Sequence, residues 1–124
     1  MSYDPSKDTW IAAGSGKSGL AFVYGIRKHD GQVELFIDRG RERSEENEKI
    51  FDILLSKQQQ IQTAFDGELE WQRLEGRQGC RIRKVTEIGG YRDEENFKEL
   101  WEWLSDAMVR LEKALKPHIN ELPF

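Results

Sequence analysis

Apolar residues recur at helical spacing near the C-terminus, and this pattern constrains the fold more than any other feature of the sequence. The stripe consists of Phe97, Leu100, Trp101, Leu104, Met108, Leu111 and Leu115. A helix with one apolar face is stable in water only when that face packs against another element. Asp93 before the stripe is a typical N-cap, and Pro117 after it predicts that the helix ends before that residue. The chain must therefore provide a second apolar surface.

Residues 20–38 predict that second surface. Residues 20–28 are rich in aromatic and β-branched side chains, and apolar side chains alternate with mostly polar ones in residues 32–38. His29-Asp30-Gly31 between them is typical of a tight turn, because Asp and Gly tolerate positive φ. The pattern predicts a β-hairpin that buries one face and leaves the other largely polar.

Further strands and one more helix complete the predicted elements. The additional strand candidates are residues 10–13, 69–74 and 80–88. The glycine-containing connection 75–79 predicts a hairpin between the last two. Residues 45–65 carry apolar side chains on one helical face, with Ser44 as the N-cap and Asp66-Gly67 as the C-terminal stop. The expected order is β-β-β-α-β-β-α.

This order predicts an α+β fold, an antiparallel sheet of four to five strands with two helices packed on one face. The other face is then open to solvent or to a partner. The chain has 124 residues, which suffices for one domain and is too short for two. We expect a flexible lead-in at residues 1–9, a single domain over residues 10–119 and a tail over residues 120–124.

Composition argues against several classes of protein. The formal net charge is −4, which is not that of a strongly basic nucleic-acid binder. One cysteine and two histidines exclude a disulfide framework and leave little for a zinc site or a His-based triad. No apolar stretch approaches the ~20 residues that span a bilayer, and no signal-peptide pattern is present. We therefore expect a cytoplasmic protein without a cofactor, a bound metal or a membrane partner.

Arginines on and near the predicted strands are the main candidate site. Arg81 and Arg83 flank Ile82 and so share one face of a strand. The full set of candidate contacts is Arg39, Arg73, Arg81 and Arg83. Guanidinium groups bind phosphates and carboxylates bidentately, so this surface is a candidate for binding nucleic acid or a protein partner. The alternative is cross-strand pairing with glutamates such as Glu70, and the sequence leaves both interpretations open.

Trp103 is a candidate interface residue. It lies about 100° from the centre of the helical stripe and is expected at the boundary of the core. A tryptophan in that position suits a homodimer or another protein interface, or a half-buried rim position.

Acidic residues give a further hypothesis. Glu34, Asp38 and Glu70 could meet on one sheet face and hold magnesium for phosphodiester cleavage. The lysine that usually follows two residues after such an acid is missing after Glu34 and Glu70. A magnesium-dependent nuclease therefore stays an alternative, and ordinary solvated strand charges are the simpler explanation.

Several stretches, taken together, resemble the prokaryotic domain-of-unknown-function family DUF4268. They are residues 33–40, 47–65, 69–71, 80–83, 91–93 and 108–119. The resemblance covers about residues 10–119, and its specificity lies in the set and its order. Family members often follow a restriction-nuclease-like domain, so the resemblance implies a module in nucleic-acid processing or defence, and no catalytic residue comes with it. We expect an accessory, non-catalytic module that binds nucleic acid, a nuclease-like domain or a second copy of itself.

Overall fold

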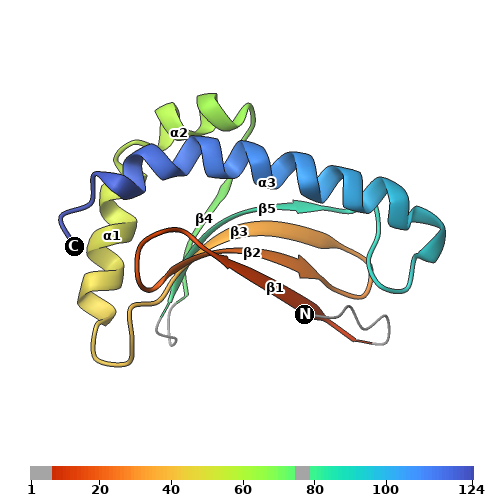
Figure 1. Cartoon of the computed structure of the whole chain (residues 1–124), viewed down its shortest axis with the longest axis horizontal. Helices are drawn as coiled ribbons and strands as arrows, with labels where there is room; N and C mark the ends of the chain where they lie inside the picture. The colour runs from red at the N-terminus through yellow and green to blue at the C-terminus, as the bar shows by residue number, and fades with distance from the viewer. Residues whose placement is uncertain (1–6, 75–78) are drawn as a thin grey trace.

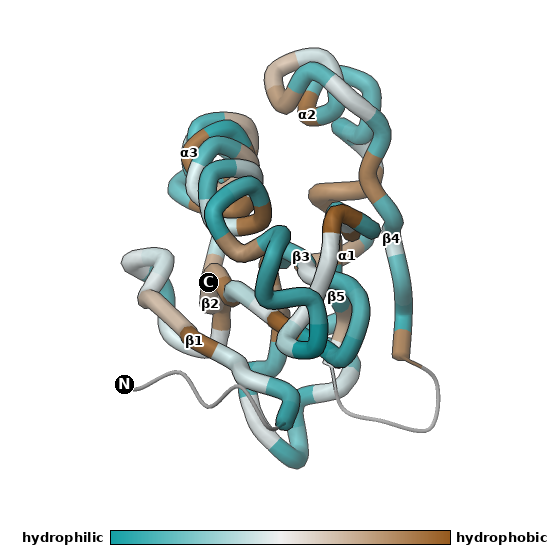
Figure 2. Tube along the Cα trace, turned by 90° about the vertical axis from the view of Figure 1, so that its right-hand side faces the viewer, coloured by the Kyte–Doolittle hydropathy of each residue, from teal (hydrophilic) through white to brown (hydrophobic). Residues whose placement is uncertain are grey.

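A five-stranded antiparallel sheet in the order β1-β2-β3-β5-β4 forms the centre of the computed structural model, which describes residues 7–74 and 79–124. The strands are β1 (Thr9–Gly14), β2 (Leu20–Ile26), β3 (Gly31–Ile37), β4 (Glu70–Arg73) and β5 (Cys80–Thr86). β1 and β4 lie at opposite edges of the sheet (Figure 2). The predicted α+β class and antiparallel sheet are confirmed.

The predicted hairpin is formed by β2 and β3. Their register runs from Leu20 opposite Ile37 to Ile26 opposite Gly31, and Arg27 N donates to Asp30 O at 2.9 Å in the turn. The alternating apolar residues of both strands are buried on one face of the sheet. Alternation in the sequence therefore predicted correctly which face of the hairpin is apolar.

Helices cover one face of the sheet. They are α1 (Ser44–Leu55), α2 (Gln58–Phe65) and α3 (Phe97–Asn120), with a short 3₁₀ turn η1 (Glu94–Asn96) before α3. The long helix α3 runs along the sheet and contacts β2 and β3, while α1 contacts β3, β4 and β5 (Figure 1). α2 packs against α3 on the same side of the sheet (Figure 2). None of the helices in the described residues has the length and hydropathy to cross a membrane.

The single helix predicted over residues 45–65 is in fact two helices. Lys57 N donates to Leu54 O at 3.0 Å, and the Ser56 hydroxyl donates to Ile53 O at 2.6 Å, so the chain leaves the α-helical pattern there. The break lets α1 pack on the sheet while α2 packs on α3. α2 ends as predicted, with Asp66 in the left-handed conformation at φ 66°. The start of α1 differs from the prediction that Ser44 is its N-cap. Arg43 O already accepts a hydrogen bond from Asn47 N, which places Ser44 inside the first turn.

α3 also departs from its predicted ends. Pro117 does not stop the helix, which continues to Asn120. Proline lacks an N–H group, and we attribute the continuation to burial of Ile119 and Leu122 beyond it, which offsets the lost hydrogen bond. Asp93 does not cap α3 either, because η1 lies between them and the Asp93 carboxylate accepts from Gly90 N at 2.9 Å.

One hydrophobic core lies between the sheet and the helices. Phe22, Phe51 and Phe65 are among its largest fully buried side chains. Cys80 is buried in this core, on the same face of β5 as Ile82. β4 and β5 pair antiparallel as the predicted hairpin requires, although most of its connection, residues 75–78, lies outside the described residues.

Candidate functional site

The sheet face opposite the helices carries rows of mostly polar side chains. The register places Glu34 of β3 beside Arg83 of β5, and Arg83 beside Glu70 of β4. The neighbouring row is Phe36, Arg81 and Gln72. Together with Gln32, these residues define what we call the open sheet face. The hairpin of β4 and β5 and the strand β3, which is distant from it in sequence, therefore contribute to one surface.

Arg83 is held by side chains on both neighbouring strands. Its Nε donates to Glu70 Oε2 at 2.6 Å, and its Nη1 donates to Gln32 Oε1 at 2.8 Å. The Arg83 side chain is 12 % exposed. This is the cross-strand pairing that the sequence left open as an alternative to ligand binding, and it orients Arg83 within the sheet.

Arg81 differs from Arg83 because it has no carboxylate within ion-pair distance among the described residues. Its Nε donates to Gln72 Oε1 at 2.6 Å, which fixes the plane of the guanidinium. Its two terminal nitrogens have no hydrogen-bond partner in the described part of the chain. Burial lowers the pKa of Arg81, and the nearby charge of Arg83 lowers it further. Arg81 thus presents an oriented pair of donors to any group that reaches this face.

Glu34 lies on β3 in the open sheet face and is buried, with 5 % of its surface exposed. Burial raises the pKa of its carboxyl above the ordinary value, while the charges of Arg81 and Arg83 oppose that rise. The Gln32 side chain is close enough to lower the Glu34 pKa as well. Even so, neither Glu34 Oε2 nor Gln32 Nε2 has a hydrogen-bond partner of normal geometry among the described residues. The charges of Arg81 and Arg83 thus favour the ionised form of Glu34 and partly offset the effect of burial on its pKa.

Replacing Glu34 by Gln is expected to stabilise the domain at neutral pH. Burial raises the pKa of Glu34 in the folded state above its value in the unfolded state. At a pH above the folded-state pKa, Glu34 is ionised in both states, and its charge then lowers the free energy of unfolding. The advantage of E34Q should shrink as the pH falls towards the unfolded value of about 4.3. Thermal unfolding between pH 4 and 8 measures the difference in Tm, which should reach a few degrees at most.

Glu87→Gln is the matched control, because Glu87 is exposed just beyond β5. It removes the same charge and should leave Tm nearly unchanged. An E34Q protein that is less stable than the wild type at pH 7 would contradict the prediction. That result would mean that the attraction of the arginines outweighs the cost of burial.

The other predicted arginines are not brought onto this face. Arg73 lies opposite Cys80 and therefore on the helix-covered side, where its guanidinium pairs with Asp52 and lies 4.9 Å from the centre of the Phe51 ring. Arg39 follows β3, and its Nε lies 2.7 Å from Glu46 Oε1. The structure thus gathers Arg81 and Arg83 and separates Arg39 and Arg73 from them.

Trp103 lies on a different part of the surface. It is seven residues before Arg110 and therefore on the same flank of α3. Arg110 Nη1 donates to Phe65 O at 2.8 Å, so this flank faces the end of α2. Trp103 is half-buried and packs against the core, in the boundary position that the sequence predicted.

The three candidate carboxylates do not converge. Arg83 lies between Glu34 and Glu70 in the register, and Asp38 Oδ1 accepts from Gly40 N at 3.0 Å. No group of three or more His, Cys, Asp or Glu residues in the described ranges is placed to hold a metal ion. The arrangement of these acids gives no support to the nuclease hypothesis.

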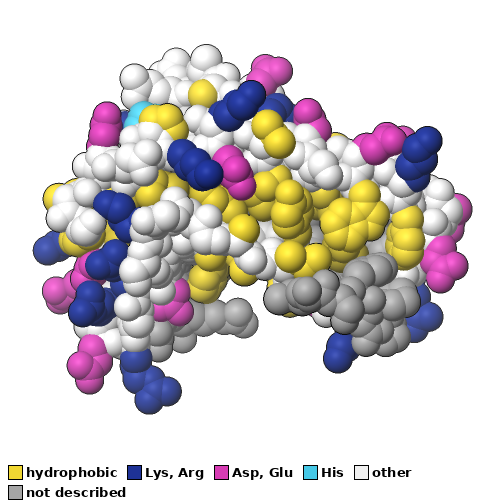
Figure 3. Space-filling model, in the orientation of Figure 1, with side chains coloured by type: hydrophobic (Ala, Val, Ile, Leu, Met, Phe, Trp, Pro, Cys, Tyr) yellow, Lys and Arg dark blue, Asp and Glu magenta, His cyan; other side chains and the backbone are white. Residues whose placement is uncertain are grey.

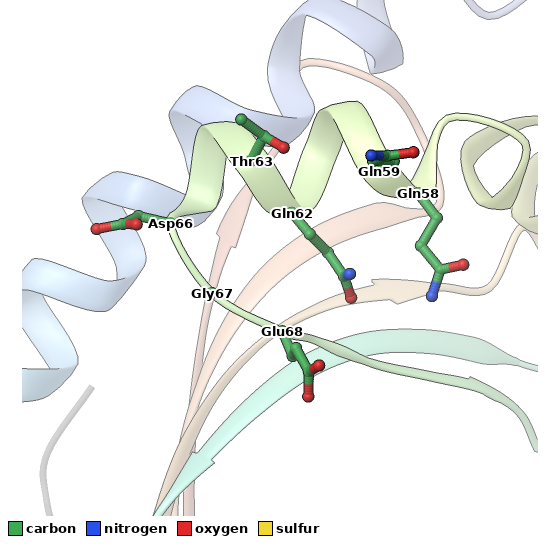
Figure 4. A pocket seen from close by; sticks show the side chains of 7 residues that line it. All are labelled: Gln58, Gln59, Gln62, Thr63, Asp66, Gly67 and Glu68. Carbon is green, nitrogen blue, oxygen red and sulfur yellow. The ribbon is translucent and has the colours of Figure 1, made fainter.

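A broad, open depression of about 560 Å³ lies elsewhere, beside α2 (Figure 4). It is lined by Gln58, Gln59, Gln62, Thr63, Asp66, Gly67 and Glu68. Asp66 and Glu68 point in different directions, and Gln62 Oε1 is occupied by Leu69 N and Trp71 Nε1. The lining therefore offers no converging set of groups for catalysis.

The glutamines of the open sheet face were not predicted from the sequence. Alternation places Gln32 and Gln72 on the polar faces of their strands, so a signal for their side was present. Their roles as partners of Arg83 and Arg81 depend on which strands are neighbours and in which register. Alternation within one strand carries no information on either point.

Comparison with known proteins identifies a family. The profile of a protein family, described as "Domain of unknown function (DUF4268)", matches residues 1–119. No protein of curated function and no solved structure matches the chain.

Proposed function

The chain belongs to DUF4268, a family of domains of unknown function, and we propose that it is a non-catalytic module that binds a protein partner through the open sheet face. Arg81 is the central polar contact in this proposal. The observation that supports it is the guanidinium of Arg81, which is oriented by Gln72 yet has two terminal nitrogens without partners among the described residues. Phe36 lies beside Arg81 in the register and adds an apolar neighbour.

The charge distribution favours a protein over a nucleic acid. Arg83 is compensated by Glu70, and Arg27 is compensated by Asp30 with Nε and Oδ1 2.5 Å apart. Glu34, when ionised, places a negative charge near Arg81. Nucleic-acid binding requires a surface that neutralises several phosphates, and the residues that the structure describes on this face carry no such excess of positive charge.

The chemistry of the face suggests what Arg81 would bind. A peptide carbonyl, a side-chain amide or a single carboxylate accepts two hydrogen bonds from a guanidinium without carrying a row of phosphates. These acceptors are abundant on proteins. The nuclease-like neighbouring domain that the family resemblance implies is one candidate for the partner, in a context of nucleic-acid processing or defence.

Selection of peptides from a displayed random library tests the proposal. We expect the wild-type domain to enrich a set of related peptides, and we expect Arg81→Gln to weaken their binding about tenfold or more. The measurement is the Kd of the enriched peptides by calorimetry or fluorescence anisotropy. Arg41→Gln is the matched control, because Arg41 is exposed in the loop before α1 and the substitution removes the same charge.

Labelled duplex DNA, single-stranded DNA and RNA form the second arm of the experiment. We expect no binding of these probes at physiological salt. If the wild type binds one of these probes and R81Q does not, the partner of the open sheet face is a nucleic acid and not a protein. Failure to enrich any peptide, or equal affinity of the enriched peptides for the wild type and R81Q, would overturn the proposal.

A further inference from the structure

The outer edge of β1 differs from the other edge of the sheet. In the described part of the chain no strand pairs with β1 on the side away from β2. β1 has the sequence TWIAAG and carries no charge. β4, at the opposite edge, is shorter and carries Glu70 and Arg73. Charges and short length are the usual protection of an edge strand against pairing, and β1 has neither.

The side chains of β1 leave its backbone accessible at that edge. A Cβ atom on Gly25 would lie 2.3 Å from Trp10 Cζ3, so the Trp10 ring lies over β2 and not beyond the edge. Ala12, Ala13 and Trp10 are exposed. A row of backbone N–H and C=O groups has one chemical complement, which is another extended strand.

An apolar surface borders this edge on the helix side. Ile11 lies opposite Tyr24 in the register, and both are half-buried. Tyr24 packs against the core, and α3 contacts β2 on the same side of the sheet. Hydrophobic side chains gather between α3 and β1 (Figure 3).

We infer that β1 pairs antiparallel with β1 of a second copy of this chain, about a twofold axis at Ile11. In this register Ile11 faces Ile11 of the second copy, a favourable pair of β-branched residues. The large Trp10 of each copy meets the small Ala12 of the other, so a large and a small side chain face each other on both sides of the axis. The axis runs perpendicular to the sheet, which places the apolar border of each copy beside that of the other.

This pairing joins the two sheets into one continuous sheet and keeps the open sheet face of both copies free. It is therefore independent of the proposed function of that face. The interface consists of one short strand and its apolar border, which is small for a protein dimer. We expect a dimer that dissociates on dilution.

Sedimentation velocity on the full chain over a concentration series tests the inference. The wild type should shift from monomer to dimer as the concentration rises. Ile11→Lys and Ile11→Glu should each be monomeric, because identical charges would face each other across the axis. An equimolar mixture of the two variants should restore the dimer, because opposite charges then meet at the axis.

Val109→Lys is the matched control, since Val109 is 52 % exposed on α3 and the substitution adds the same charge as I11K. It should dimerise like the wild type. A wild-type protein that stays monomeric at the highest concentration would overturn the inference, as would I11K that dimerises like the wild type.

If circular dichroism shows that the Ile11 variants do not fold, Ala13→Lys at an exposed position of the same edge should raise the dimer Kd about tenfold or more. An unchanged Kd would then overturn the inference.

Discussion

Gly90→Ala should destabilise the domain by about 3 kcal/mol or more, at the upper end of the range for single substitutions. A Cβ atom at this position would lie 1.9 Å from Arg27 O and 2.6 Å from His29 N, and both are backbone atoms that cannot turn away. Tyr91 N donates to Arg27 O at 2.9 Å just beyond the contact. The substitution must therefore separate the loop before η1 from the turn between β2 and β3. Urea unfolding measures the loss of free energy.

Gly14→Ala is the control for this experiment. No heavy atom lies within 4 Å of a Cβ built on Gly14, and its φ is not positive. Its unfolding free energy should stay within about 0.5 kcal/mol of the wild type. A G90A protein that is as stable as G14A would mean that the two loops do not touch as the structure places them.

Leu104→Ala should destabilise the domain by about 2–5 kcal/mol. Leu104 is fully buried in the centre of α3, and its Cδ2 lies 3.6 Å from a Cβ built on Gly31 at the start of β3. Truncation removes apolar contacts and leaves a cavity between α3 and the sheet. The measurement is again urea unfolding, with the m-value confirming that the folded and unfolded states are otherwise comparable.

Val109→Ala on the same helix is the matched control. Val109 is 52 % exposed, and alanine has the higher helix propensity, so this variant should be as stable as the wild type or slightly more stable. If L104A and V109A were equally stable, the face of α3 assigned to the core would be wrong. Their difference thus measures the docking of α3 separately from the helix itself.

Much of the fold could be predicted from local patterns. The hairpin of β2 and β3 was predicted because alternation and the Asp30-Gly31 turn act over a few neighbouring residues. The break at Ser56 and Lys57 was not predicted, because the apolar stripe continues through it and no proline or glycine marks it. The passage of α3 through Pro117 was missed because burial of Ile119 outweighs a local signal.

The candidate site was predicted only in part, and for a similar reason. Arg81 and Arg83 share a face because two residues separate them on one strand. Arg73 shares a face with Trp71 by the same rule, and Trp71 packs against the core, so Arg73 lies on the side of the helices. Gln72 belongs to the site only because it accepts a hydrogen bond from Arg81 on the neighbouring strand β5, and the sequence of β4 alone does not show this contact.

The sequence by itself determined which face of each strand and helix is apolar, because side-chain direction follows from the local backbone period. The tertiary structure alone decided which charges meet. Arg83 has Glu70 on one side and Glu34 on the other because β5 lies between β3 and β4 in one register. The same register places Phe36 and Gln72 beside Arg81, so that none of the described carboxylates contacts Arg81. Strand order and register result from packing between distant segments, and a local pattern does not specify them.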